Sequence, residues 1–365
     1  MRGLASAGFG NTKGSPAAVR GLVMVLLAIL IGCAGVDGQI GPEPDTANRC
    51  PEPGAGIQIG GDFGSGTDTE RTPVRRLVLM GGGREEDQAA QHFVEAAAGG
   101  DVVVLRASGS LTSYPDYFGT SLAPVPAPSS VVTVRTTSPE SGADPAVLCR
   151  AGRAEALWLA GGNQWNYLGR WPSELHDSLA AAVARGAAIG GTSAGAVSLG
   201  EIAFDARHGT VTSSEALANP LHRDVSVSRP TIAQPELAGT IVDSHFMERS
   251  REGRLLVFLA RFLAERGEGP VVGLGLDEGV AVLIEAGAYR VTSVDAGAAW
   301  LYHVSGPATL ENGTPLSLDR IRRVRLPAGS TGGWPFHFGD ADGAELLRVE
   351  AGVVRVSAQS ADKPS

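Results

Sequence analysis

Short apolar runs alternate with amphipathic segments between residues 75 and 290. The helix-like segments are "EEDQAAQHFVEAAAGG" (85–100) and "SELHDSLAAAVARG" (173–186). The apolar runs are "RRLVLMGGG" (75–83), "DVVVLRAS" (101–108), "SVVTVRTT" (130–137), "ALWLAGG" (156–162) and "AAIGGTS" (187–193). Apolar strands that alternate with helices are typical of a parallel sheet covered on both faces. The pattern therefore predicts an α/β fold, a parallel sheet flanked by helices, over residues 74–290.

The pattern changes in the C-terminal part of the chain. Shorter strand-like runs, "YRVTSVDAG", "AAWLYHV" and "ELLRVEAGVVRVSA", are separated by turn signals such as "ENGTP". We therefore expect residues 291–365 to form a β-rich C-terminal extension and tail.

The N-terminus carries the pattern of an export signal. Three cations, Arg2, Lys13 and Arg20, come before the apolar stretch "GLVMVLLAILIG", which is followed at once by Cys33. This stretch is short for a membrane-spanning helix and has the length of a signal-peptide core. The sequence "LIGC" also resembles a bacterial lipobox, in which the cysteine is lipidated and becomes the new N-terminus. We expect residues 1–33 to be a lipoprotein-type signal peptide and the mature protein to be exported and membrane-anchored through lipid on Cys33; a plain membrane anchor is the alternative.

Residues 34–73 are rich in Pro, Gly and small polar residues, a composition typical of a flexible linker. "GGDFGSG" (60–66) superficially resembles a phosphate loop, but it lacks the Lys-Ser/Thr ending and is assigned to the linker. Beyond Cys33 the chain has two cysteines, Cys50 and Cys149. An exported protein allows them to pair, and a buried, unpaired Cys149 is the alternative.

Composition excludes some classes of function. A net charge of −9 and the lack of a basic stripe argue against a nucleic-acid binder. The chain has no HExxH motif, and its histidines and cysteines lack metal-ligand spacing, so no metal or cofactor is expected. The oligomeric state stays open, and a homodimer is compatible with the sequence.

A candidate nucleophile lies in "IGGTSAGAVSLG" (189–200). Ser193 is the serine of a G-x-S-x-G pattern that follows a predicted strand, as in a nucleophile elbow. An ordinary tight turn also favours such small residues. However, "GGG", "AGGNQ" and "GGTSAG" all follow predicted strands, and parallel sheets bind ligands at the carboxyl ends of their strands. We therefore expect a site at this edge.

A serine nucleophile needs a base and a group that orients the base. Of seven histidines, His245 directly follows the apolar run "TIVD" and "S", at another strand end. Three arginines follow it: Arg249, Arg251 and Arg254. They can bind a carboxylate or a peptide oxygen; alternatively, they lie at the start of a helix and form ordinary ion pairs there. Asp277 and Glu278 lie between two apolar runs, where a carboxylate is costly unless exposed or paired. A role in orienting a histidine would explain why an acidic residue lies between these two runs.

Four motifs, in order, carry a family resemblance: "LWLAGGNQ", "GGTSAGA", "VDSHFMERSREGRLL" and "GLGLDEGVAVLI". Residues 75–290 resemble the cyanophycinase branch of the serine peptidase family that includes aspartyl dipeptidase. The resemblance implies a fold like that of class I glutamine amidotransferases, with serine in place of their cysteine nucleophile. It also implies a Ser–His–Glu triad at Ser193, His245 and Glu278.

The same resemblance implies further site residues. The backbone amides of Gly162 and Ala194 are the expected oxyanion donors. Positions that line the family's substrate site correspond to Gln164, Asp243, Arg249, Arg251 and Arg254. The chain departs from the family pattern at Asn163, Ser244 and Ser250, near the substrate, so the departures concern the substrate more than the chemistry.

The sequence thus predicts an exported serine-type peptidase. It would cleave peptide or isopeptide bonds, with cyanophycin or β-Asp-Arg-type peptides as substrates, through an acyl-enzyme. One alternative is an α/β-hydrolase esterase, which requires the order Ser, acid, His and hence a late histidine such as His337, with "GGG" as its oxyanion loop. The other is a non-catalytic binding lipoprotein on the same fold.

Overall fold

The computed structural model describes residues 49–64, 67–267, 269–340 and 343–357. The described residues belong to one compact unit. The predicted signal peptide, Cys33 and the first part of the predicted linker lie outside the described residues. Within the described ranges, no helix is long and apolar enough to cross a membrane.

A nine-stranded mixed sheet has a parallel centre in the order β4-β3-β5-β6-β2. Antiparallel strands extend it at both edges, β1 beside β4, and β11, β12 and β16 beyond β2. The strands are β1 (Gln58–Gly64), β2 (Leu77–Met80), β3 (Asp101–Arg106), β4 (Ser130–Arg135), β5 (Ala156–Leu159), β6 (Ala188–Thr192), β11 (Val280–Glu285), β12 (Ala288–Ser293) and β16 (Thr331–Gly333).

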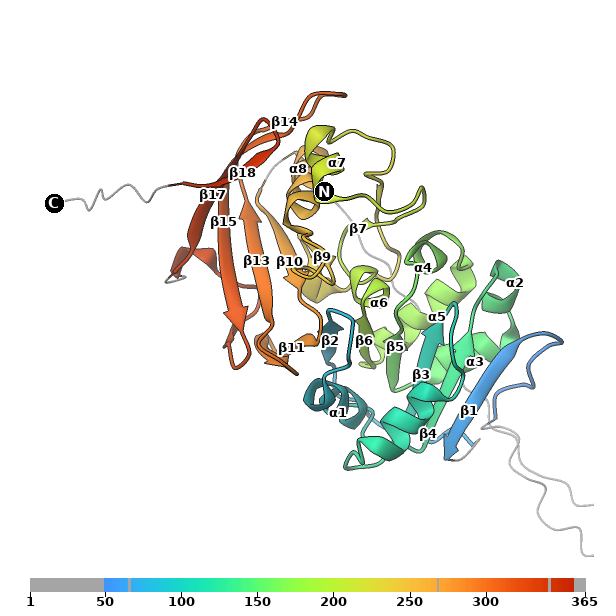
Figure 1. The fold of residues 1–365 in the computed structure, drawn as a ribbon. Helices are drawn as coiled ribbons and strands as arrows, with labels where there is room; N and C mark the ends of the chain where they lie inside the picture. The colour runs from blue at the N-terminus through green and yellow to red at the C-terminus, as the bar shows by residue number, and fades with distance from the viewer. Residues whose placement is uncertain (1–48, 65–66, 268, 341–342, 358–365) are drawn as a thin grey trace, which may run out of the picture. The chain divides into compact units, whose positions relative to one another are not determined.

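Helices cover both faces of the parallel strands (Figure 1). Successive side chains of a strand point to opposite faces, so Leu77 and Leu79 pack in one core cluster and Val78 and Met80 in another. The first cluster includes α3 (Pro145–Arg153) and α5 (Ser173–Ala184), and the second includes α1 (Asp87–Glu95) and the π-helix η2 (Pro115–Ser121). The predicted α/β fold is confirmed.

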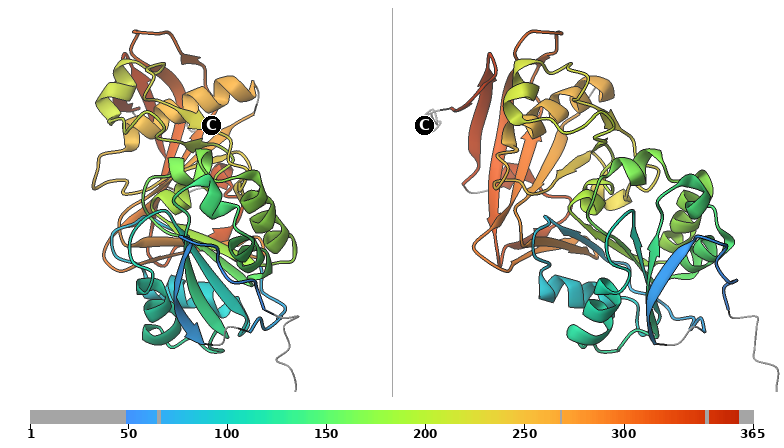
Figure 2. Two further views of the ribbon diagram at one scale, coloured as in Figure 1. Left: turned by 90° about the vertical axis from the view of Figure 1, so that its right-hand side faces the viewer. Right: turned by 45° about the vertical axis from the view of Figure 1, so that its right-hand side comes forward.

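A second sheet begins with the parallel pair β9 (Thr240–Asp243) and β10 (Val271–Leu276). It continues antiparallel through β13 (Ala298–Val304), β15 (Ser317–Pro327), β17 (Glu345–Glu350) and β18 (Val353–Val356), with β14 (Ala308–Thr309) beside β15. The apolar helix α8 (Glu252–Arg266) packs with these strands, and Figure 2 shows the two sheets as distinct layers of ribbon. The β-rich C-terminal region is therefore present, but residue 290 is no structural boundary, because β13 pairs directly with β10.

The remaining elements are short. They are α2 (Pro139–Gly142), α4 (Trp165–Gly169), α6 (Ala194–Val197), α7 (Ser213–Ala218), η3 (Pro235–Leu237), η4 (Phe338–Asp340) and the two-stranded pair β7 (Ala203–Phe204) and β8 (Val227–Ser228).

The predicted linker over 34–73 is wrong for its described part. Strand β1 pairs with β4, and Ile57, Ile59 and Phe63 pack against the cores of the sheet. The glycines that suggested a linker have a packing role instead: a Cβ on Gly61 would overlap the carbonyl oxygen of Leu111. A Gly-rich composition therefore indicated flexibility where the chain needs close backbone contact.

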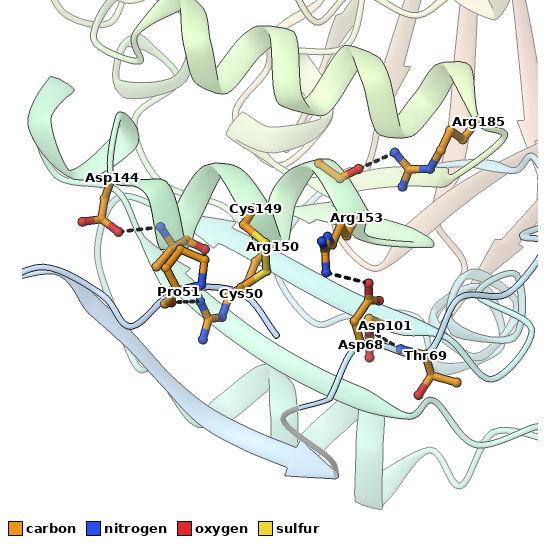
Figure 3. The surroundings of a disulfide bond; sticks show 12 residues. Cys50, Pro51, Asp68, Thr69, Asp101, Asp144, Cys149, Arg150, Arg153 and Arg185 are labelled. Atoms are coloured by element: carbon orange, nitrogen blue, oxygen red, sulfur yellow. Dashed lines mark hydrogen bonds and ion pairs between the residues drawn. A yellow bond between two sulfur atoms is a disulfide. The ribbon is translucent and has the colours of Figure 1, made fainter. Parts of the chain in front are cut away.

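Cys50 and Cys149 form a disulfide that joins the segment before β1 to α3 (Figure 3). Arg150 donates to Pro51 O at 3.3 Å, and Arg153 pairs with Asp68 at 3.2 Å. Of the two alternatives left open by the sequence, the paired one holds. These contacts fasten the described residues on both sides of β1 to the α/β core.

Candidate active site

Ser193 lies in a strained turn between β6 and α6. Its φ is +52°, a value that non-glycine residues rarely adopt. The turn is close-packed, because a Cβ on Gly195 would overlap the carbonyl oxygen of Leu159 in the neighbouring strand β5. Strand, strained serine and helix follow one another as in a nucleophile elbow, and only small residues fit beside the serine.

His245 and Glu278 complete a hydrogen-bonded chain with this serine. Ser193 Oγ lies 2.7 Å from His245 Nε2, and His245 Nδ1 lies 2.5 Å from Glu278 Oε1. With Nδ1 protonated, the imidazole donates to Glu278 and its Nε2 accepts from the serine hydroxyl. The sequence-predicted Ser193, His245 and Glu278 are thus brought together.

The three residues come from different parts of the fold. Ser193 follows β6 of the first sheet, whereas His245 follows β9 of the second. Glu278 lies in the turn that leads from β10 of the second sheet to β11 of the first. The site therefore lies where the two sheets meet, although the sequence suggested the edge of one sheet.

The loop Gly81–Gly83, which follows β2, ties these segments to one another. Gly81 O accepts from His245 N at 2.8 Å, and Gly82 O accepts from Gly279 N at 2.9 Å. A Cβ on Gly82, where φ is +93°, would lie 2.6 Å from His245 Nε2. Sequence analysis placed "GGG" at the sheet edge but missed this role in seating the histidine; its position directly after an apolar strand was the available signal.

The electrostatic surroundings of His245 favour its neutral form. Burial lowers the pKa of His245 below its ordinary value, the hydrogen bond with Glu278 opposes this, and the charges of Arg249 and Arg251 lower the pKa further. A neutral imidazole with Nε2 facing a hydroxyl can accept its proton. The surroundings of His245 therefore favour an imidazole that is able to accept a proton.

A cavity of about 240 Å³ opens beside Ser193. It is lined by Ser193 and His245, by the backbone around Gly162 and Ala194, by the side chains of Asn163 and Gln164, by Ser244 and the three arginines, and by Val197, Phe204, Ala206, Gly209 and Thr210. Ala194 is the first residue of α6, so its N–H is among those that a helix leaves without an internal acceptor. The volume is slightly below the usual range of ligand pockets, roughly 300–1,000 Å³, so the cavity suits a small group.

Asp243, which the family resemblance places at the substrate site, is buried and paired with arginines. Its carboxylate is 2% exposed and accepts from Arg254 Nε at 2.8 Å and from Arg254 Nη2 at 2.6 Å. Arg251 Nη1 lies 3.5 Å from the same carboxylate. Asp243 is thus a buried counter-ion behind the arginines, because two cations at the cavity wall need a compensating charge.

The arginines differ in how freely they reach the cavity. Arg254 is 3% exposed and lies 5.0 Å from the ring of Phe204, whereas Arg249 is 53% exposed. Arg251 donates to Ser244 O at 2.6 Å, and burial lowers its pKa to about 10. Arg249 is therefore the cation with the greatest freedom to meet a ligand.

The polar residues predicted around the substrate have structural partners as well. Gln164 Nε2 donates to Phe204 O at 3.0 Å, and Asn163 Oδ1 accepts from Trp165 N at 2.9 Å. Ser250 has a φ of +49°, and its carbonyl accepts from Ser213 Oγ at 2.5 Å. His337, the late histidine that the esterase alternative would use, is exposed in the segment after β16, and the histidine in hydrogen-bond contact with Ser193 Oγ is His245.

Metal chemistry has no visible site in the described ranges. No group of three or more His, Cys, Asp or Glu side chains there is arranged to hold a metal ion.

No model of a known protein family matches the chain, and no curated protein matches it. A solved peptidase from an acI-B1 Actinobacterium is similar, with 14% identity over 72% of this chain and 98% of its own, and a TM-score of 0.47. A candidate peptidase E from Listeria monocytogenes EGD-e has 13% identity over 60% of this chain and 99% of its own, with a TM-score of 0.38. Because both scores are below 0.5, function has to be inferred from the site itself.

Proposed function

We propose that the protein is a serine hydrolase that cleaves peptide or isopeptide bonds through an acyl-enzyme. The observation that carries this proposal is the chain of hydrogen bonds from Ser193 through His245 to Glu278, at 2.7 and 2.5 Å. A base in contact with the nucleophile, and oriented by a carboxylate, is the arrangement that activates a serine hydroxyl. The strained elbow at Ser193 is a second support, since it presents the hydroxyl to a cavity.

The residues imply one sequence of steps. His245 takes the proton as Ser193 Oγ attacks the carbonyl carbon, and Glu278 stabilises the imidazolium that results. The N–H groups of Gly162 and Ala194 would donate to the oxyanion. His245 then returns the proton to the leaving nitrogen, and water, deprotonated by the same histidine, releases the acyl group and regenerates the serine.

For the substrate we propose an acyl group with a carboxylate, as in cyanophycin or β-aspartyl peptides. The support is the excess of positive charge at the cavity, where Asp243 compensates part of the charge of Arg251 and Arg254, and Arg249 is more than half exposed. A guanidinium binds a carboxylate in a two-point geometry. The motifs resembling cyanophycinase favour the same class of substrate.

The test of the nucleophile is labelling with a fluorophosphonate, followed by peptide mapping. We expect label on Ser193 of the wild type and none on Ser193→Ala. We also expect His245→Ala and Ser193→Ala each to lower turnover by roughly 10⁴-fold or more, with the double variant little worse, because triad members act as a unit. An unlabelled but folded wild type would leave the non-catalytic binding lipoprotein as the better reading.

The substrate is tested by comparing cyanophycin, β-aspartyl dipeptides, α-linked dipeptides and short esters. Turnover confined to esters, or lost in His337→Ala and kept in His245→Ala, would favour the esterase alternative. Turnover of α-linked dipeptides alone would refute the proposed substrate and leave the triad in place.

We further propose that the protein is exported and anchored by lipid on Cys33. The supports are the "LIGC" sequence and the disulfide between Cys50 and Cys149, a bond typical of oxidising compartments. Mass spectrometry of membrane-extracted protein should find acyl mass on Cys33 at the N-terminus. A mature chain that still contains residues 2–31 would contradict this.

A further inference from the structure

Two side chains stack beside the segments that line the cavity, although neither of them lines it. The guanidinium carbon of Arg207 lies 5.5 Å from the ring centre of Trp165. Arg207 is in the loop after β7, and Trp165 is the first residue of α4, so the stack joins two segments about 40 residues apart. Neither residue has a role in the proposed triad.

Both partners of the stack are held in place by other groups. Arg207 Nη2 lies 3.4 Å from Asp205 Oδ2, and Asp205, which is fully buried, also accepts from Ser228 Oγ at 2.5 Å. On the other side, the indole of Trp165 lies flat on Gly169, where a Cβ would overlap the ring. The position of the indole therefore depends on the absence of a side chain at residue 169.

The segments joined by this stack are two walls of the active-site cavity. The loop contributes Ala206, Gly209 and Thr210, and the chain just before α4 contributes Gly162 and the following two side chains. A hydrogen bond from Gln164 to Phe204 O already ties the walls at a deeper level. The stack of Arg207 on Trp165 adds a second contact between the two walls. The loop that carries Arg207 has positive φ at Ala206 and Gly209 and is otherwise largely exposed.

We propose that Arg207 and Trp165 form a clasp that fixes residues 205–210 as a wall of the cavity, and thereby limits the size of the substrate group that reaches Ser193. The size limit, though not the clasp itself, rests on the proposed function. A cation–π contact at an exposed site contributes little free energy, so residues 205–210 can still move away from the cavity. Loss of the contact should raise the population in which this wall is displaced about two- to fivefold.

The clasp is tested by hydrogen exchange of the peptide that covers residues 205–210. We expect Arg207→Gln and Trp165→Leu each to raise the exchange rate about two- to fivefold, and the double variant to add nothing further. Gly169→Ala should have the same effect, because it displaces the indole. Arg170→Gln is the matched control, since Arg170 is an exposed cation in the same segment that bonds Asn166 instead.

The size limit is tested by labelling Ser193 with a small and a bulky fluorophosphonate. The small probe should react at equal rates with the wild type and with Arg207→Gln, and the bulky probe about two- to fivefold faster with the variant. Unchanged exchange in both clasp variants would overturn the clasp, and an unchanged ratio of the two probes would overturn its role in substrate size. A wild type that neither probe labels would overturn the proposed function and the size limit with it, while exchange would still report on the clasp.

Discussion

At the scale of single residues, opposing interactions determine the pKa of His245. Its hydrogen bond with Glu278 stabilises the charged imidazolium, whereas burial and two nearby arginines disfavour it. The lowered pKa of His245 favours the neutral imidazole, the form that the proposed mechanism requires as a base. The guanidinium of Arg249, 4.0 Å from the carboxylate of Glu278, is part of this balance.

Replacing Arg249 should therefore move the pH dependence of the reaction. In the proposed mechanism activity requires neutral His245, so kcat/KM should fall as the pH drops through the pKa of this histidine. Arg249→Gln removes a cation that lowers that pKa, and we expect the acid limb of the profile to shift to higher pH. The profile of kcat/KM is the measurement, and Arg223→Gln, a distant arginine that is 74% exposed, is the control. An unmoved acid limb in Arg249→Gln would argue against this coupling.

The buried pair of Asp243 and Arg254 is the second residue-scale prediction. Asp243→Asn should destabilise the protein by about 3–5 kcal/mol, because it leaves a buried guanidinium without its counter-ion. Arg254→Met combined with Asp243→Asn should recover much of that loss, since the buried charge is then removed. Urea unfolding measures both. Wild-type stability in Asp243→Asn, with a change in KM alone, would return Asp243 to the substrate role that the sequence suggested.

At the scale of elements, the turn from β6 to α6 determines where the nucleophile lies. Leu159 of β5 contacts Gly195 so closely that the helix and the strand leave no room for a methyl group between them. The same principle governs the Gly81–Gly83 loop, against which the imidazole of His245 rests. The small residues of the motifs thus position reactive side chains by allowing backbone segments to approach.

Gly195→Ala tests this close packing. The added methyl group must push α6 away from β5, so we expect a loss of about 1–3 kcal/mol in stability. The displaced Ser193 should also lose turnover, because small misplacements of reacting groups are costly. Gly152→Ala in α3 is the control: its nearest contact would be 3.8 Å, so the helix propensity of alanine should leave stability unchanged or raised. Equal behaviour of the two variants would exclude the packing explanation.

At the scale of the whole described unit, the fold is continuous across the predicted domain boundary. The second sheet carries His245 at the end of β9, and β10 leads into Glu278 and then into the first sheet. The C-terminal strands extend the sheet from which two of the three triad residues are positioned.

The prediction at the scale of the whole described unit concerns the disulfide between Cys50 and Cys149. It closes a loop of 99 residues, and its removal should lower the free energy of unfolding by roughly 2–4 kcal/mol. Cys50→Ala/Cys149→Ala should therefore melt earlier than the oxidised wild type and be insensitive to reductant. Neither cysteine lines the active-site cavity, so turnover of the folded variant should be unchanged. A melting temperature that reductant leaves unchanged in the wild type would contradict the prediction.

The choice of Glu278 over Asp277 came from the family resemblance, whereas the central strands, the turn at Ser193 and the position of His245 after a strand were predicted from the residues themselves. These signals are local, since apolar runs, flanking glycines and strand ends can be read within a few positions of the chain. Tertiary structure decided what depends on distant contacts. Residues 58–64 form a strand because they pair with β4. Asp243 is a counter-ion because Arg254 of α8 donates to its carboxylate. His245 comes to the site from the second sheet. Composition cannot distinguish a glycine that makes a linker flexible from one that allows another backbone segment to pack closely. The difference depends on which segment lies beside the glycine in the folded protein.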